Sequence, residues 1–140
     1  MRYLLDTNIM IAAMKQVATV KRQLEQRLLA DMLLSPVVLG ELEFGVEKSA
    51  YREKNAARLA ELVERLELVP IDDGVSRRYG EIRVHLERCG TPIGANDLWI
   101  AAQGSALGAI VVTDNQEEFN RVPGLRTENW IKRRAADQKV

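Results

Sequence analysis

The chain has 140 residues, of which 46% are hydrophobic and 29% charged, and its twenty basic and twenty acidic side chains cancel. This length and composition predict one globular domain. A neutral chain is not expected to bind nucleic acid by charge alone, and no apolar run approaches the roughly 18 residues that a membrane-spanning helix needs.

The first half of the chain alternates short apolar runs with helical patterns. Ser35 followed by Pro36 is typical of a helix start, and Val20, Leu24 and Leu28 recur at helical spacing. Strands are expected at 2–5 and 32–34, and helices at 9–14, 18–30, 36–49 and 53–66.

The second half continues the alternation. A stripe of Val75, Tyr79, Ile82 and Leu86 predicts a helix that Gly90 and a following proline end. A further helix is expected at 94–107, and strands at 68–71, 109–112 and 125–127. Short strands alternating with helices predict an α/β sandwich with a mainly parallel sheet, whose ligands bind at the carboxyl ends of the strands.

Two aspartates, Asp6 and Asp114, each follow an apolar run predicted to be a strand. Aspartate there is also a common helix cap or turn residue. Thr7 or Asn8 could cap the first helix, however, which would leave Asp6 free. Asn115 could serve the turn beside Asp114 equally well. We expect the two carboxylates to meet at one edge of the sheet.

Glu41 falls between apolar positions of its predicted helix, whereas Glu43 and Glu47 fall together on the opposite face. A buried carboxylate needs a cation or hydrogen-bond partners. The alternative is a structural ion pair, in which Lys48 of the same helix supplies the positive charge for Glu41.

Asp97 lies on the packed side of its predicted helix, since Ala101 and Gly104 follow at four and seven residues. Those small residues allow another backbone to approach closely. The alternative is a first-turn acid favoured by the helix dipole, with Asn96 as the cap.

If these acids converge, their like charges need a divalent cation between them. Oxygen ligands suit Mg²⁺ or Mn²⁺, whereas Zn²⁺ prefers His and Cys. Such a site supports attack of metal-activated water on a phosphodiester.

Four segments in this order resemble the PIN-domain family, and especially its VapC-type ribonuclease toxins of type II toxin–antitoxin pairs: LLDTN, LGELEFGVEKS, GTPIGANDLWIAA and VVTDNQEEFNRVPGLRTENW. The resemblance covers about 1–130. It implies a PIN-like (Rossmann-like) α/β/α sandwich with a short, mainly parallel central sheet. The single nuclease domain is expected at 1–131, and a basic tail at 132–140.

By motif, the resemblance assigns the catalytic acids to Asp6, Glu41 and Asp97. The fourth position falls at Asp114 or Asn115, and the sequence leaves that choice open. Asp6 and Asp97 are implied as the principal metal ligands, while Glu41 and Asp114 bind directly or through water. Glu41 is the candidate to accept the proton of the attacking water. The implied supporting residues are Thr7, Asn8, Thr113 and Asn115.

The resemblance further implies a Mg²⁺-dependent endoribonuclease that Mn²⁺ also supports, with products that carry 5′-phosphate and 3′-hydroxyl ends. Its expected partners are an RNA substrate and a VapB-like antitoxin that occupies the active-site groove. A homodimer, and a larger hetero-oligomer with the antitoxin, are expected. Cys89 is alone and the N-terminus does not resemble a signal peptide, so we expect a cytoplasmic protein without membrane contact.

Three alternatives remain: a structure-specific DNA nuclease, a catalytically silent PIN-like binding domain, and a phosphate-accepting regulatory domain, which is disfavoured because no lysine follows a predicted strand. His85 falls off its helix stripe and is expected on the surface. Trp99 and Trp130 are expected to pack or to lie in a dimer interface rather than to stack on bases. A basic run, 132–134, could follow phosphates or simply be solvated.

Overall fold

The computed structural model describes residues 1–131, so the predicted basic tail, with Lys132, Arg133 and Arg134, lies outside the described residues. Five strands form one sheet in the order β3-β2-β1-β4-β5, and all four pairings are parallel. This confirms the predicted sheet. The strands are β1 (Tyr3–Leu5), β2 (Met32–Leu34), β3 (Glu67–Leu68), β4 (Ile110–Val112) and β5 (Thr127–Glu128).

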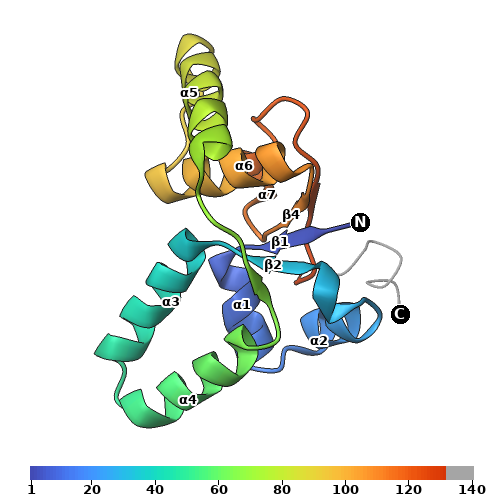
Figure 1. Ribbon diagram of the computed structural model, residues 1–140, viewed down its shortest axis with the longest axis vertical. Coiled ribbons are helices and arrows are strands. Elements are labelled where there is room, and N and C mark those ends of the chain that lie inside the picture. The colour runs from blue at the N-terminus through green and yellow to red at the C-terminus, as the bar shows by residue number, and fades with distance from the viewer. Residues whose placement is uncertain (132–140) are drawn as a thin grey trace.

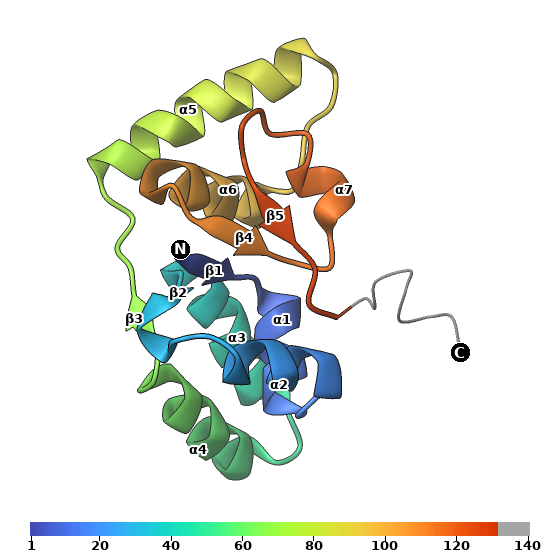
Figure 2. The same cartoon turned by 90° about the vertical axis from the view of Figure 1, so that its right-hand side faces the viewer.

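Helices lie on both sides of the strands, with α1 to α4 on one side and α5 to α7 on the other (Figures 1 and 2). Within the described part of the chain, none is long and apolar enough to cross a membrane. The helices are α1 (Thr7–Met14), α2 (Ala18–Glu25), α3 (Pro36–Lys48), α4 (Arg52–Val63), α5 (Asp73–Arg88), α6 (Ala95–Leu107) and α7 (Gln116–Phe119), with a 3₁₀ turn at Leu29–Asp31.

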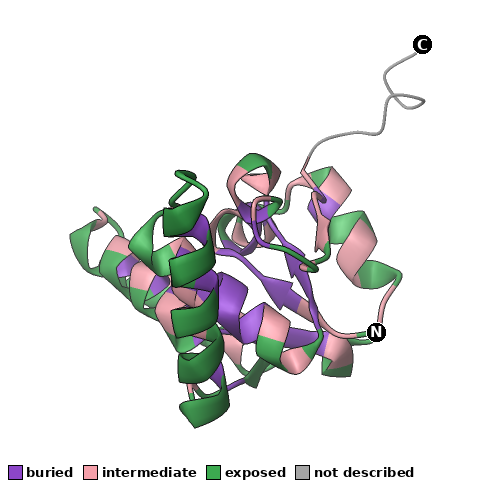
Figure 3. Ribbon diagram, turned by 90° about the horizontal axis from the view of Figure 1, so that it is seen from above, coloured by how far each residue is buried: buried purple, intermediate pink, exposed green. Residues whose placement is uncertain are grey.

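The core lies in the strands and in the inward faces of the helices, while the outer helix faces are exposed (Figure 3). Every residue of β2 and of β4 is buried. Because both faces of these central strands are covered, their sequences are continuously apolar rather than alternating.

Helix α6 packs unusually close to β4. A Cβ atom built on Gly104 would lie 2.6 Å from Cγ2 of Val111, and Ala101 on the same face is fully buried. The small residues therefore allow the close approach that the sequence predicted. This packing sets the position of the helix that carries Asp97.

Helix α3 begins as predicted. Ser35 Oγ accepts a hydrogen bond from the Val37 backbone N–H at 3.1 Å, and Pro36 occupies the first turn. The start of this helix fixes the register of Glu41 relative to the sheet.

The prediction that the second helix reaches residue 30 is wrong. Helix α2 ends at Glu25, and Leu28 has an extended backbone (φ −75°, ψ 130°) and a side chain that is 71% exposed. The chain must turn here to enter the buried strand β2, and this requirement overrides the apolar spacing of Leu28.

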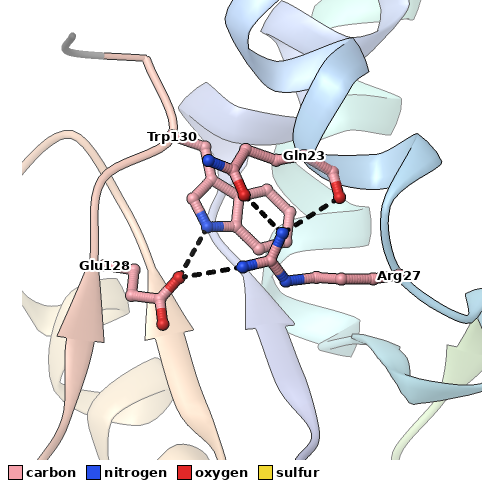
Figure 4. A network of polar contacts seen from close by, with 4 residues as sticks. All are labelled: Gln23, Arg27, Glu128 and Trp130. Carbon is pink, nitrogen blue, oxygen red and sulfur yellow. Dashed lines mark hydrogen bonds and ion pairs between the residues drawn. The ribbon is translucent and has the colours of Figure 1, made fainter. Parts of the chain in front are cut away.

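The same turn places Arg27 in a polar network that joins α2 to the segment after β5 (Figure 4). Its guanidinium lies 4.9 Å from the Tyr3 ring centroid and 4.8 Å from that of Trp130. It also bonds to Gln23 and lies 3.7 Å from Glu128, which accepts a bond from the Trp130 indole N–H at 2.9 Å. These contacts fix the edge strand β5 against α2.

Both edge strands are shifted from their predicted positions. Strand β3 is Glu67–Leu68 rather than 68–71, because Pro70 cannot donate a ladder hydrogen bond. Strand β5 is Thr127–Glu128 rather than 125–127. A turn through Gly124 (φ +74°), closed by a bond from Leu125 N–H to Val122 O, occupies the earlier positions.

Candidate functional site

The predicted acids come together at the carboxyl end of the sheet. Asp6 follows β1 and Thr113 follows the neighbouring strand β4. Glu41 comes from α3, and Asp97 from the first turn of α6. Hydrogen bonds connect these elements at the carboxyl end of the sheet, which is the arrangement that the strand-end argument predicted.

Asp6 is the most buried of these acids, with 3% of its surface exposed. Its carboxylate accepts bonds from Thr113 Oγ1 at 2.7 Å, the Thr7 backbone N–H at 2.8 Å and Asn8 Nδ2 at 3.4 Å. Burial raises the pKa of Asp6, these bonds from Thr113 and Thr7 oppose that rise, and the charges of Glu41 and Asp114 add to it.

The prediction that Thr7 or Asn8 caps the first helix is wrong, because Asp6 is itself the N-cap. With the cap already formed, Thr7 and Asn8 turn their side chains toward other parts of the site. Asn8 Oδ1 accepts a bond from the Asp114 backbone N–H at 3.2 Å. Asp6 therefore both begins a helix and presents a carboxylate.

Glu41 is held from two sides. Thr7 Oγ1 donates to its Oε2 at 2.8 Å, and Asn96 Nδ2 donates to its Oε1 at 3.0 Å. Lys48 does not take the role of its partner, since the Lys48 ammonium lies over the Phe44 ring at 4.9 Å. The bonds from α1 and α6 hold the half-buried carboxylate of Glu41 beside the carboxyl end of the sheet.

The other two glutamates of α3 are exposed, as predicted. Glu47 forms an ion pair with Arg52 at 2.8 Å, which lowers its pKa. Glu43 thus provides a solvent-facing carboxylate on the same helix as Glu41.

Asp97 is half-buried beside two other acids. Loss of hydration raises its pKa to about 7, and contact with Glu118 and the charge of Asp6 contribute to the rise. A bond from Asn115 Nδ2 to Asp97 Oδ2 at 3.3 Å opposes it. The ionised form of Asp97 therefore lacks compensating positive charge.

The two candidates for the fourth position have different surroundings. Asp114 is exposed, whereas Asn115 reaches Asp97 and also donates to Glu118 Oε2 at 2.6 Å. Asn115 and Glu118 thus line the side of the site near Asp97. Asp114 remains close enough for its charge to raise the pKa of Asp6.

Glu118 is the site residue that the sequence analysis missed. It stands three positions after Asn115, the N-cap of α7, and this spacing matches that of a capping box. Because N-cap and N3 side chains share one side of a helix start, that spacing could have placed Glu118 beside Asn115 at the end of β4.

The acids are spread over the carboxyl end of the sheet rather than gathered at one point. In residues 1–131, no three Asp, Glu, His or Cys side chains lie close enough together to enclose an ion by themselves. Mg²⁺ retains much of its water shell and needs only one or two protein carboxylates. Burial, with a smaller contribution from neighbouring carboxylates, raises the pKa of Asp6 and of Asp97, and a cation would favour their ionised forms. The donor set thus fits a hydrated divalent cation.

His85 and the two tryptophans lie as the sequence predicted. His85 is exposed, with Nε2 3.7 Å from Cys89 Sγ. Trp99 stacks on Tyr79 with ring centroids 3.9 Å apart, and Trp130 is buried. The expectation that both tryptophans pack is confirmed.

The chain matches the family model described as the PIN domain over residues 3–125. It is 38% identical over 130 residues to a tRNA(fMet)-specific endonuclease VapC of Shigella flexneri, covering 93% of this chain and 98% of that protein. It is 42% identical over 136 residues to ribonuclease VapC2 of Rickettsia felis, covering 94% and 100%.

Solved structures agree. The structure of VapBC2 from Rickettsia felis bound to a promoter DNA fragment contains a chain with 40% identity and a TM-score of 0.86, covering 93% of this chain and 99% of that one. The structure of DNA-bound VapBC from Salmonella typhimurium contains a chain with 36% identity and a TM-score of 0.87, covering 93% of this chain and 98% of that one.

Proposed function

Since the chain belongs to the PIN domain family, and within it to the VapC ribonucleases, we propose that it is a metal-dependent endoribonuclease, the toxin of a VapBC-like toxin–antitoxin pair. The observation that carries the proposal is the meeting of Asp6, Glu41 and Asp97 at the carboxyl end of the sheet. The reaction is hydrolysis of an RNA phosphodiester, which leaves 5′-phosphate and 3′-hydroxyl ends.

Asp6 and Asp97 are proposed as the principal ligands of Mg²⁺, with Mn²⁺ as a substitute. Glu41, Asp114 and Glu118 are proposed to complete the site directly or through water, and Asn115 adds its amide beside Asp97. When bound, the cation supplies an acidified water and neutralises charge on the phosphate. The raised pKa values of Asp6 and Asp97 support a cation at this place.

The supporting residues hold the carboxylates for this task. Thr113 and Asn8 both donate to Asp6 Oδ2 and so fix the orientation of this carboxylate at the start of α1. Thr7 and Asn96 each donate a hydrogen bond to one oxygen of the half-buried Glu41 carboxylate and so fix its orientation. Glu41 is the proposed acceptor for the proton of the attacking water, since a neutral hydroxyl and a neutral amide anchor it.

The proposed partners are RNA and a VapB-like antitoxin, because the matched structures are VapBC complexes. A homodimer and a larger assembly with the antitoxin are part of the same proposal. A nearly neutral toxin with an acidic opening also fits an antitoxin that brings a basic side chain to the site.

The proposal is tested by cleavage of purified RNA with Mg²⁺, with Mn²⁺ and with a chelator. We expect cleavage with either metal, none with chelator, and a loss of at least about 100-fold in Asp6→Asn and Asp97→Asn. Glu43→Gln, which changes an exposed acid on α3, should cleave as the wild type does.

Single-stranded and flap DNA in the same assay tests the DNA-nuclease alternative, and a wild type inactive on RNA would favour the silent binding domain. Cleavage that persists with chelator would contradict the metal-dependent mechanism. Expression of the two site variants should also no longer arrest growth.

A further inference from the structure

Helix α7 carries Glu118 and directly follows Asn115, yet it has only four residues. Helices this short are not stable by themselves, so the orientation of Glu118 depends on what holds α7. Phe119, which is fully buried, attaches the helix to the core at one point. A single apolar anchor leaves the tilt and rotation of such a short helix undetermined.

Thr127 on β5 bonds to both ends of α7. Its Oγ1 accepts a bond from Gln116 Nε2 at 3.1 Å and donates to Asn120 Oδ1 at 2.8 Å. Gln116 is the first residue of α7 and Asn120 is its C-cap. One hydroxyl has a donor and two acceptor sites, so both bonds form together.

Strand β5 is itself fixed, which makes Thr127 a firm attachment point. Its neighbour Glu128 bonds to Trp130 and pairs with Arg27 in the turn that follows α2 (Figure 4). Successive side chains of a strand point to opposite faces, so Glu128 contacts this turn while Thr127 contacts α7. The strand also pairs with β4, whose end carries Thr113.

We propose that Thr127 is a positioning residue of the acidic site. Its hydroxyl holds both ends of α7 so that Asn115 and Glu118 face Asp97. Thr127 touches none of the proposed metal ligands, and it acts on them through Gln116 and Asn120. The inference rests on the proposed function for its catalytic consequence only, since the contacts themselves belong to the metal-free protein.

The test replaces Thr127 by valine, which keeps the shape and removes the hydroxyl, and by serine, which keeps the hydroxyl. Thr19→Val is the matched control, because Thr19 is also half-buried and donates to Ile131 O at 3.3 Å, away from α7. Asn120→Ala removes the acceptor without changing β5 and gives a second route to the same result.

The first readout is the Asn115 side-chain amide in NMR spectra of the metal-free full chain. Thr127→Val and Asn120→Ala should shift this resonance and speed its hydrogen exchange, while Thr127→Ser and Thr19→Val leave it unchanged. The second readout is Mn²⁺ affinity by calorimetry, which should fall about tenfold in the first pair only. A purely structural role would lower the melting temperature without either change.

The third readout is RNA cleavage, in which Thr127→Val should lower kcat about tenfold and change KM little, with recovery in Thr127→Ser. A wild-type amide signal and Mn²⁺ affinity in Thr127→Val would overturn the inference, as would equal losses in valine and serine. If Thr127→Val does not fold, Asn120→Ala decides by the same criteria. If the wild type cleaves no RNA, the proposed function is refuted. The NMR signal of the Asn115 amide and the Mn²⁺ affinity then still test the role of Thr127.

Discussion

At the scale of single residues, the hydrogen bonds that the described residues make to the carboxylates of Asp6 and Glu41 come from neutral donors. Asp6 is bonded by Thr113, Thr7 and Asn8, and Glu41 by a hydroxyl and an amide. Neutral donors fix the direction of a carboxylate but do not cancel its charge. The metal-free protein therefore retains electrostatic repulsion in its folded state.

This repulsion predicts how stability depends on pH in the absence of metal. Folding raises the pKa of Asp97 to about 7, from the value of 3.8 that an aspartate has in an unfolded chain. Between these values the folded chain holds a proton that the unfolded chain has lost, so the contribution of Asp97 to stability falls as pH rises through this window. The free energy of unfolding, from urea titrations between pH 5 and 8, should therefore decline with pH, and less steeply in Asp97→Asn.

Asp73→Asn is the control for this experiment, because it removes an exposed acid from α5. It should leave the slope of the wild type unchanged. Parallel slopes for the wild type and Asp97→Asn would contradict the assignment of the raised pKa to Asp97.

The two donors to Glu41 give a second residue-scale prediction. Thr7→Val and Asn96→Ala each remove one of its bonds, and the carboxylate should then sample other orientations. We expect kcat for RNA cleavage to fall by about 10- to 100-fold in each variant, with unchanged far-UV circular dichroism. Thr91→Val, a hydroxyl loss at an exposed position, should retain full activity.

The sequence was sufficient for the three acids whose positions follow from periodicity or strand ends. Glu41 and Asp97 could be placed because apolar neighbours define an inward helix face. Glu118 was missed because α7 is a single turn, too short for periodicity to define a face. Which of Asp114 and Asn115 faces Asp97 depends on a backbone turn after β4, which residue types alone do not determine.

At the scale of elements, the sheet determines where the helices end. Helices with strong local signals matched their predictions, as α3 did from Ser35 and Pro36. Helix α2 and the edge strands did not. Arg27 after α2 makes tertiary contacts, and the turn through Gly124 precedes β5; local sequence patterns contain neither feature. The central strand β4 was predicted to within one residue because burial on both faces requires a continuous apolar run.

The close packing of α6 on β4 predicts opposite effects for two glycine substitutions. Gly104→Ala places a methyl group 2.6 Å from Val111 Cγ2, so we expect a loss of about 1–3 kcal/mol in the free energy of unfolding. Gly80→Ala adds a methyl with no atom within 4 Å on exposed α5, and should stabilise by roughly 0.5–1 kcal/mol.

Chemical denaturation of both variants checks this prediction. Equal stabilities for the two alanine variants would contradict the close approach of α6 to β4. Activity per folded molecule of Gly104→Ala reports, in addition, whether a displaced α6 moves Asp97.

At the scale of the whole molecule, the chain is neutral, whereas the proposed substrate, RNA, is a polyanion that would meet the acidic side chains of the site. Residues 71–120 carry eight acidic and four basic side chains, and residues 121–140 carry two acidic and six basic ones. RNA cannot approach carboxylates closely unless their charge is offset. In the proposed function, a divalent cation would therefore serve RNA binding as well as the chemistry, and its removal should also lower the stability of the fold.

The final prediction links the metal to the stability of the entire domain. A cation that binds only the folded state raises the free energy of unfolding by about 2.7 kcal/mol at a free concentration of about 100 times its Kd. Mn²⁺ should therefore raise the melting temperature of the wild type. In Asp6→Asn, the buried charge is gone and Oδ1 can still accept the cap bond from the Thr7 backbone N–H, but the amide nitrogen that replaces Oδ2 cannot accept from Thr113 Oγ1 or Asn8 Nδ2. The melting temperature of this variant should respond little to Mn²⁺. A metal response equal to that of the wild type would show that Asp6 is not a ligand.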